Sequence, residues 1–414
     1  MSSWNTRFRR FIDRRTYITC CRFLAYLPIV RALINPPAGS IHLQSASATP
    51  DPSANAGTGL FSTDHICEAE TIVIPASPSS SGDSSNDHLG PVHYRTNSRS
   101  VTTVQDGFYR NASGFHEVVI LDSDNRIIHD LSPDVNPPKY HRIYQDFSLA
   151  SSTQKIDRAV CLTTPGARNN YYHWLIELIP KFFLLQAANI ACGSTYKYLI
   201  NGSRQSYEKQ SLAYFGVSTA DIIQTFPGMR LNVQTLIVPN HSDDYEAVPR
   251  WAVDFLYQAI QPSTQQLKAL QSQSSKKLFI YRPQSARRHM ANFTEVKDCL
   301  EREGYLAVNP GSLTFEQQVS LFRSADSIIA EHGAALANLV FCYHCTKILE
   351  LFSPFWATDS YRVISYHKGI RYTCLWGDPC TSSENNSGSS ITMNYRIPLD
   401  RLMPCVTDAS GSHK

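Results

Sequence analysis

The chain has 414 residues, of which 42% are hydrophobic and 18% are charged, and its formal net charge is +3. These values exclude a disordered or membrane-embedded protein, and the length suits two domains of ordinary size. No long basic run follows residue 31, so we expect no nucleic-acid partner. The eleven cysteines are scattered, which argues against a disulfide framework and favours a reducing compartment.

Residues 1–34 combine a basic start with an apolar stretch. Five arginines lie between positions 7 and 15, and Arg22, Pro28 and Arg31 interrupt the apolar stretch that follows. No charge-free run is long enough to span a bilayer, and no convincing cleavage site follows. We therefore predict either a helix on an anionic membrane surface or a helix packed on the protein's own body. We expect a protein of the cytoplasm or of the cytoplasmic membrane face.

Composition and periodicity organise the rest of the chain. Residues 35–59 are predicted to form a linker, and a Ser-rich stretch at 76–87 a loop. Short β-like runs follow between residues 92 and 130. From Tyr171 onward, helix-like and strand-like pieces alternate, which predicts an α/β fold with parallel strands and helices on both faces.

A polar stretch at residues 261–275 predicts a domain boundary, after which the alternation restarts. The predicted strands are "KKLFIYR", "YLAVNP", "DSIIAE" and "KILELF", and the predicted helices are "FTEVKDCLEREG", "TFEQQVSLFRSA" and "GAALANLVF". We therefore predict four parts: a basic segment and linker (1–59), a first Rossmann-like domain (60–262), a second one (263–395) and a tail (396–414).

The sequence around His173 contains a candidate catalytic pair. It reads Asn-Asn-Tyr-Tyr-His-Trp and continues to Glu177, four residues after the histidine, so both side chains share one helix face. His173 suits a general base that deprotonates a hydroxyl group, and Glu177 can orient or replace it. The alternative is a partly buried polar pair that bridges helices.

Arginines follow the strand "LFIYR", and they are candidates for binding phosphate. Arg282 ends the strand, and Arg287, Arg288 and Asn292 come next. Guanidinium groups bind a diphosphate through paired hydrogen bonds. The alternative is an exposed basic loop. The chain has no Gly-Lys-Ser/Thr loop and no G-x-G-x-x-G, so the motifs do not favour an ATPase or a dinucleotide enzyme.

The strand ending at Glu331 leads directly into His332, Gly333 and Ala334, where a helix is predicted to begin. Small residues let a ligand approach the backbone. The first amides of a helix have no partners within it and suit a phosphate or diphosphate. Ligands also bind at the carboxyl end of a strand in an open α/β sheet. The alternative is a helix start with a capping histidine.

Cys342 and Cys345 are candidates for a metal site. Their spacing resembles half of a zinc site, but no second pair of ligands stands at a suitable distance. We therefore expect cysteines that pack near a helix end, and no bound metal.

Together these blocks resemble glycosyltransferase family 61, and in particular members of bacterial polysaccharide biosynthesis. The resemblance covers residues 118–371. Its blocks are "NYYHWLIELIPKFFLL", "LFIYRPQSARRHMAN", "SLTFEQQVSLFRSADSIIAEHGAALANLVF" and "ILELF".

The resemblance implies a GT-B architecture: two Rossmann-like domains facing a cleft, the first for the acceptor and the second for the donor. It also implies inverting transfer from a nucleotide sugar, often UDP-linked, without a metal or other cofactor. The implied acceptor is a glycan, a lipid-linked glycan or another hydroxyl compound, as in surface or capsular polysaccharide assembly. Carried over by position, the donor phosphates lie among Arg282, Arg288, His332, Gly333 and Ala334, with Asn338 and Glu350 in support and Glu350 towards the ribose.

Two residues depart from the usual family pattern. Glu331 stands where a small residue or proline often precedes the histidine, and Ala337 stands where Thr or Ser is common. Either change can alter donor choice. Two other functions stay open: a non-catalytic module that binds a nucleotide sugar or polysaccharide, and a sugar-nucleotide epimerase.

Overall fold

The structure is a computed structural model. It describes residues 37–41, 43, 61–76, 90–111, 118–132, 142–145, 153–202, 204–240, 246–263, 265, 268, 277–283, 288–343, 345, 347–380 and 393–407. The helix predicted within residues 1–34 lies outside this range, as does Arg287. The chain divides into two compact units. The first comprises Met1–Glu68, Ser98–Gln205 and Phe215–Ser242, and the second Ala69–Asn97, Ser206–Tyr214 and Asp243–Lys414.

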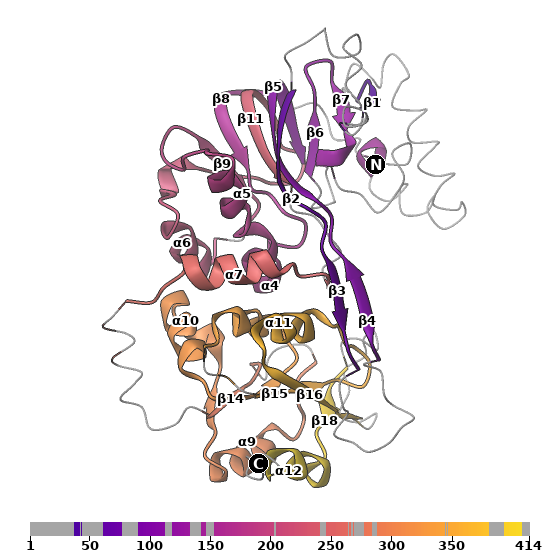
Figure 1. Cartoon of the computed structure of the whole chain (residues 1–414), viewed down its shortest axis with the longest axis vertical. Coiled ribbons are helices and arrows are strands. Elements are labelled where there is room, and N and C mark those ends of the chain that lie inside the picture. Colours follow the sequence, from indigo (N-terminus) through magenta and orange to yellow (C-terminus); the bar gives the residue numbers. More distant parts are fainter. Residues whose placement is uncertain are drawn as a thin grey trace, which may run out of the picture. The chain divides into compact units, whose positions relative to one another are not determined.

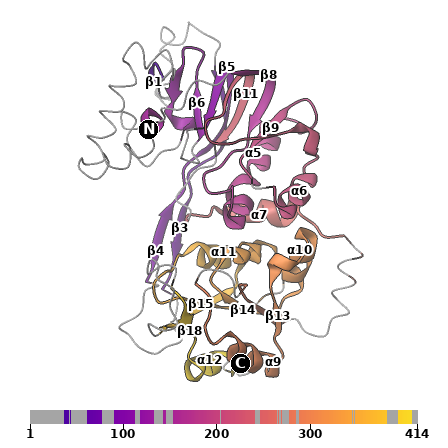
Figure 2. The ribbon, with the colours of Figure 1, turned by 180° about the vertical axis from the view of Figure 1, so that it is seen from behind.

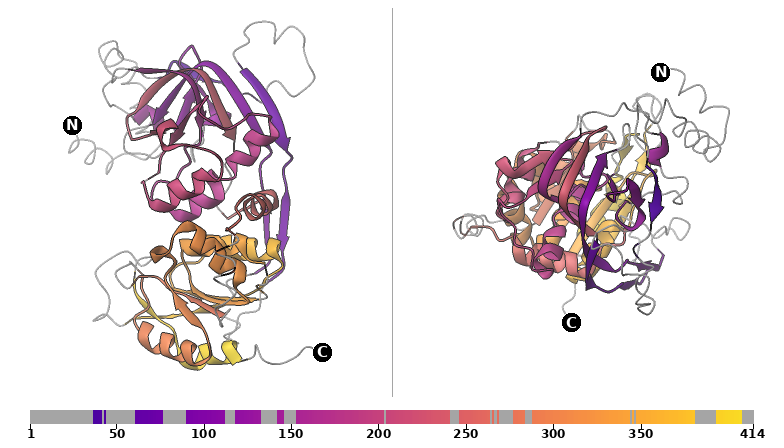
Figure 3. Two further views of the ribbon diagram at one scale, coloured as in Figure 1. Left: turned by 90° about the vertical axis from the view of Figure 1, so that its left-hand side faces the viewer. Right: turned by 90° about the horizontal axis from the view of Figure 1, so that it is seen from above.

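A mixed sheet of nine strands forms the centre of the first unit (Figures 1 and 3). Its order is β1-β7-β6-β5-β11-β8-β9-β10, and β2 also pairs with β5. The strands are β1 (Gly39–Ile41), β2 (Phe61–Cys67), β5 (Arg99–Asn111), β6 (Val118–Leu121), β7 (Arg126–Ile128), β8 (Gln154–Cys161), β9 (Lys197–Ile200), β10 (Ile222–Gln224) and β11 (Arg230–Asn240).

Parallel pairing holds for only part of this sheet. Strands β11, β8, β9 and β10 pair with one another in parallel, whereas β5 is antiparallel to β2, β6 and β11. The link from β5 to β6 is too short for the crossover that a parallel pair needs, so the two strands must run in opposite directions. The α/β prediction is confirmed, and the strands after Tyr171 pair in parallel with β8 or with one another, while β11 is antiparallel to the earlier strand β5.

The helical run predicted after Tyr171 forms in three pieces between β8 and β9. They are α4 (Tyr171–His173), a π-helix η6 (Trp174–Leu178) and α5 (Lys181–Ala187). Pro180 has no N–H to donate, and the turn before it widens, with Ile179 N bonded to Trp174 O at 3.1 Å. Trp174 is fully buried, and α5 packs against β5 and β11.

The second unit contains a five-stranded parallel sheet of order β13-β12-β14-β15-β16. Counted along the chain, this order is 2-1-3-4-5, and it reverses between β12 and β14. Such a reversal opens a crevice at the carboxyl ends of the two strands, where α/β proteins bind ligands. The strands are β12 (Lys277–Ile280), β13 (Leu306–Val308), β14 (Ser327–Glu331), β15 (Lys347–Phe352) and β16 (Arg371–Trp376).

Helices cover both faces of this sheet, with α10 and α11 on one face and α9 and α12 on the other (Figures 1 and 2). Thr314 and Gln317 form a capping box at the start of α10, as a Thr N-cap predicts. Apolar side chains of β12, β14, β15 and β16 pack with those of α9 and α12. The helices are α7 (Arg250–Ala259), α9 (Phe293–Arg302), α10 (Phe315–Ser324), α11 (Ser360–Lys368) and α12 (Leu399–Thr407).

Two earlier segments belong to the second unit. The hairpin of β3 (Thr71–Ile74) and β4 (Val92–Arg95) is joined to it through Tyr94, whose hydroxyl lies 2.9 Å from Glu246 and 3.1 Å from Asp359. Helix α6 (Ser206–Ala213) is joined through Gln210, which accepts a hydrogen bond from the amide of Phe315. The compact units therefore do not follow a single break in the chain. In the described residues, no helix combines the length and apolarity needed to cross a membrane.

Candidate functional site

Arg282 and the backbone of His332 meet at the point where the strand order of the second unit reverses. Arg282 follows β12, and His332 follows β14. The backbone amide of Arg282 donates to Glu331 Oε1 at 3.1 Å, and its guanidinium Nη1 donates to the carbonyl of His332 at 3.1 Å. The two segments that the sequence marked for phosphate binding thus lie side by side at a ligand-binding edge.

The His332 ring is fixed by a buried carboxylate. Its Nδ1 lies 2.6 Å from Glu350 Oε1, and the hydroxyl of Tyr372 donates to Glu350 Oε2 at 2.6 Å. Glu350 is fully buried, and the imidazole stacks on Phe352 with ring centroids 5.0 Å apart. Glu350 accepts from Nδ1–H, so the ring can donate to a phosphate oxygen only when Nε2 also carries a proton. Both Glu350 oxygens thus bind protein side chains.

The helix after His332 is a 3₁₀ helix, η9 (Ala334–Phe341), rather than the expected α-helix. Gly333 is extended, and a Cβ there would lie 3.5 Å from Arg282 Nη1. The side-chain amide of Asn338 donates to Gln318 Oε1 and to Ala335 O, which ties η9 to α10. The first amides of a 3₁₀ helix precede its i to i+3 bonds and can bind an anion.

Arg288 stands in the loop between β12 and α9. Its φ of 59° lies in the left-handed region, and burial, followed by the charge of Arg282, lowers the pKa of its guanidinium. Asn292 of the same loop is buried and exchanges two hydrogen bonds with the backbone of Ile397. Its amide therefore holds the loop, while Arg288 lies in the electrostatic field of Arg282.

Sequence reasoning missed Tyr395. The tyrosine hydroxyl donates to Glu331 Oε2 at 3.0 Å, and both side chains are buried. Burial raises the pKa of Glu331 to about 7, although hydrogen bonds from Arg282 and Tyr395 and the charges of Arg282 and Arg288 oppose this rise. The only signal in the sequence was the departure of Glu331 from the family pattern. No local motif connects it with a tyrosine 64 positions away.

In the first unit, His173 and Glu177 form the predicted i, i+4 pair. His173 Nδ1 lies 2.7 Å from Glu177 Oε1, and the side chains are 24% and 21% exposed. Asn170 caps the helix start by accepting from the amide of Tyr172. A Cβ at Gly166 (φ +82°) would come within 2.7 Å of the His173 ring. The carboxylate fixes Nδ1–H, which leaves Nε2 as a base on a partly exposed ring.

Lys181 lies one further turn along this helix, with its charge buried. Its ammonium donates to the carbonyls of Thr163 at 2.8 Å and Leu162 at 3.3 Å. Burial lowers the pKa of Lys181 from 10.5 to about 8, and the Cys161 thiol and Glu177 carboxylate act in the opposite direction.

The free energy of unfolding should depend on pH because the charge of Lys181 is buried. Because the folded-state pKa of Lys181 is depressed, the unfolded chain binds more protons between pH 8 and 10.5, and stability rises with pH across that window. Lys181→Met removes this rise. The free energy of unfolding of the wild type should therefore gain about 3 kcal/mol relative to the variant between pH 7 and 11. Denaturant unfolding across this range, with Lys197→Met as the control, measures it, and parallel curves would contradict a buried Lys181 charge.

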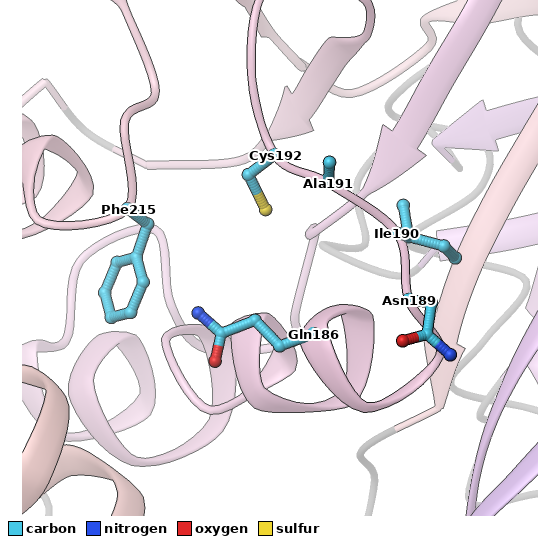
Figure 4. A pocket seen from close by; sticks show the side chains of 6 residues that line it. All are labelled: Gln186, Asn189, Ile190, Ala191, Cys192 and Phe215. Atoms are coloured by element: carbon cyan, nitrogen blue, oxygen red, sulfur yellow. The ribbon is translucent and has the colours of Figure 1, made fainter.

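A surface pocket of the first unit lies away from the predicted residues. It is lined by Gln186, Asn189, Ile190, Ala191, Cys192 and Phe215 (Figure 4). None of the predicted site residues lines it, so we assign it no role.

Cys342 and Cys345 are buried after η9, and their thiols are hydrogen-bonded to each other. Within the described part of the chain, no group of three or more His, Cys, Asp or Glu side chains is arranged to hold a metal ion.

Comparison with known proteins gives one family match. Residues 171–349 match the family model described as Glycosyltransferase 61. The matched range contains His173, the segment from Arg282 to Asn292 (the arginine loop) and the turn at His332, so the family resemblance seen in the sequence is confirmed. A comparison with functionally curated proteins finds no match to this chain.

Proposed function

Residues 171–349 form a glycosyltransferase family 61 domain, and from that premise we propose that the protein transfers a sugar from a nucleotide sugar, UDP-linked by preference, to a hydroxyl acceptor with inversion. The observation that carries this proposal is the cluster of Arg282, Arg288 and His332 at the strand-order reversal. Two guanidinium groups, helix amides and a directed imidazole suit a leaving diphosphate.

In the proposed reaction, His173 Nε2 takes the proton of the acceptor hydroxyl. The acceptor oxygen then attacks the anomeric carbon from the face opposite the nucleotide, and the bond from that carbon to the phosphate oxygen breaks. Arg282, Arg288, the amides of Gly333 and Ala334, and His332 in the form that carries a proton on Nε2 stabilise the charge that develops on the diphosphate. Glu350 and Asn338 hold His332 and η9 in place. The reaction needs a GT-B arrangement, in which the first unit presents His173 to an acceptor opposite the donor.

The biological setting is part of the same proposal. A glycan or lipid-linked glycan is the acceptor, in surface or capsular polysaccharide assembly. Residues 1–34, with their arginines beside an apolar stretch, suit contact with the cytoplasmic membrane face.

A transfer assay tests the proposal. Purified full-length protein is incubated with a panel of nucleotide sugars, with and without glycan acceptors, and the products are identified by mass spectrometry and anomeric NMR. We expect one donor to yield a product of inverted anomeric configuration. Nucleotide binding without turnover would favour the non-catalytic module, and an epimerised donor would favour the epimerase.

The proposed chemistry assigns the leaving diphosphate to arginines and backbone amides, so activity should persist in excess EDTA. Turnover of the preferred donor, measured before and after dialysis against EDTA, checks this. Activity that disappears on chelation and returns with Mn²⁺ or Mg²⁺ would contradict the metal-independent mechanism.

A further inference from the structure

In the second unit, residues 394–397 support the arginine loop through backbone and side-chain hydrogen bonds. Residues 394–397 run beside residues 289–292, and a parallel β-bridge joins Met290 to Tyr395. Arg288, at the start of this stretch, has a left-handed backbone, which is unfavourable for a non-glycine residue and persists only where the surrounding structure supports it. The contacts are His289 N to Asn394 Oδ1 (3.2 Å), Ala291 N to Tyr395 O (2.8 Å), Asn292 Nδ2 to Ile397 O (2.8 Å) and Ile397 N to Asn292 Oδ1 (3.0 Å).

The same segment reaches the strand that leads to His332. Glu331 accepts from the backbone amide of Arg282 through one oxygen and from the hydroxyl of Tyr395 through the other. The charged groups that face this carboxyl are Arg282 and Arg288, and Tyr361 of α11 lies in the field of the same two arginines. Glu331 therefore joins the end of β12, the end of β14 and the segment at residues 394–397.

We propose that Glu331 and Tyr395 are positioning residues that set the geometry and charge of Arg282 and Arg288 for a nucleoside diphosphate. This inference rests on the donor site of the proposed function. An anion on the two guanidinium groups brings negative charge next to the buried carboxyl. Glu331 therefore takes up a proton from solvent as the nucleotide binds.

The direction of the pH effect follows from linkage. Burial raises the pKa of Glu331 to about 7, so above pH 7 the carboxyl is mostly ionised and a bound anion favours its protonation. Affinity should fall as pH rises, by up to about tenfold for each unit by which the ligand raises the carboxyl pKa. UDP is the probe, and pH 7 to 8.5 is the window, since a terminal phosphate has its own pKa of about 6.

Calorimetric titration of the full chain with UDP, in buffers of different ionisation enthalpy, measures both affinity and proton uptake. The wild type should take up protons and lose affinity with rising pH, whereas Glu331→Gln should show neither effect. Tyr395→Phe removes a donor that favours the ionised carboxyl, so its transition should move to higher pH. Glu301→Gln, which changes an exposed carboxylate of α9, should behave as the wild type.

The outcomes separate the two proposals. If the wild type binds neither UDP nor GDP nor ADP, the donor site itself is wrong. If UDP binds and its pH dependence is the same in the wild type, Glu331→Gln and Tyr395→Phe, the donor site stands and the positioning role is overturned. If the variants melt at a lower temperature but keep the wild-type pH profile of UDP binding, Glu331 and Tyr395 have only a structural role and the proposal is overturned. Should Glu331→Gln fail to fold, the pH profile of Tyr395→Phe decides.

Discussion

Arg288→Ala should lower kcat/KM for the preferred nucleotide sugar by an amount equivalent to about 2–4 kcal/mol of transition-state stabilisation. The guanidinium lies beside that of Arg282, and burial and this like charge both disfavour its cationic form. Holding two such charges together is unfavourable without an anion, so a leaving diphosphate gains from both. Because the charge on the diphosphate grows as the glycosidic bond breaks, the loss should appear in kcat as well as in donor affinity.

The control for this variant is Arg302→Ala, which removes an exposed arginine of α9 in the same unit. Both variants should melt near the wild-type temperature, since the backbone contacts of residues 289–292 remain. Steady-state kinetics with the two variants decide the assignment. An Arg288→Ala protein with the kcat/KM of the Arg302→Ala control would remove Arg288 from the donor site.

The second half of the chain was the easier to predict because its strands are short, apolar and separated by strongly marked helices. Gly304 and the Thr314 cap bound α9 and α10 as the sequence indicated. The helix type of η9 was harder to predict, because a short apolar sequence does not distinguish a 3₁₀ helix from an α-helix. The first half mixes antiparallel and parallel pairing, and β5 partners such as β11 lie more than a hundred residues away, beyond any local pattern.

In the candidate site, too, local sequence patterns predicted some contacts and missed others. The i, i+4 spacing of His173 and Glu177 is a local property and predicted their contact. The meeting of Arg282 and His332 followed from the rule that parallel strands end at one edge. By contrast, the roles of Asn292 and Tyr395 depend on residues 394–397, and Ile397 contacts Asn292 across a separation of 105 positions. Nothing in the sequence near Arg288 indicates that contact.

His173→Ala should lower kcat by roughly 10²–10⁴, the usual contribution of a general base, while the dissociation constant of the donor stays nearly constant. His173 belongs to the first unit, and its Nδ1 is engaged by Glu177, so only Nε2 can take the acceptor proton. His332→Ala should instead weaken nucleotide binding together with turnover, because its ring belongs to the proposed donor cluster. His65→Ala, an exposed histidine of β2, is the control.

The comparison with Glu177→Gln identifies which member of the pair is the base. If Glu177 only orients His173 and favours the tautomer with a free Nε2, Glu177→Gln should retain more activity than His173→Ala, because glutamine can still accept from Nδ1–H. If the carboxylate is itself the base, Glu177→Gln should be the more damaging change. Donor dissociation constants and kcat for the three variants resolve the roles. Turnover at the wild-type rate by His173→Ala would show that the acceptor proton leaves by another group.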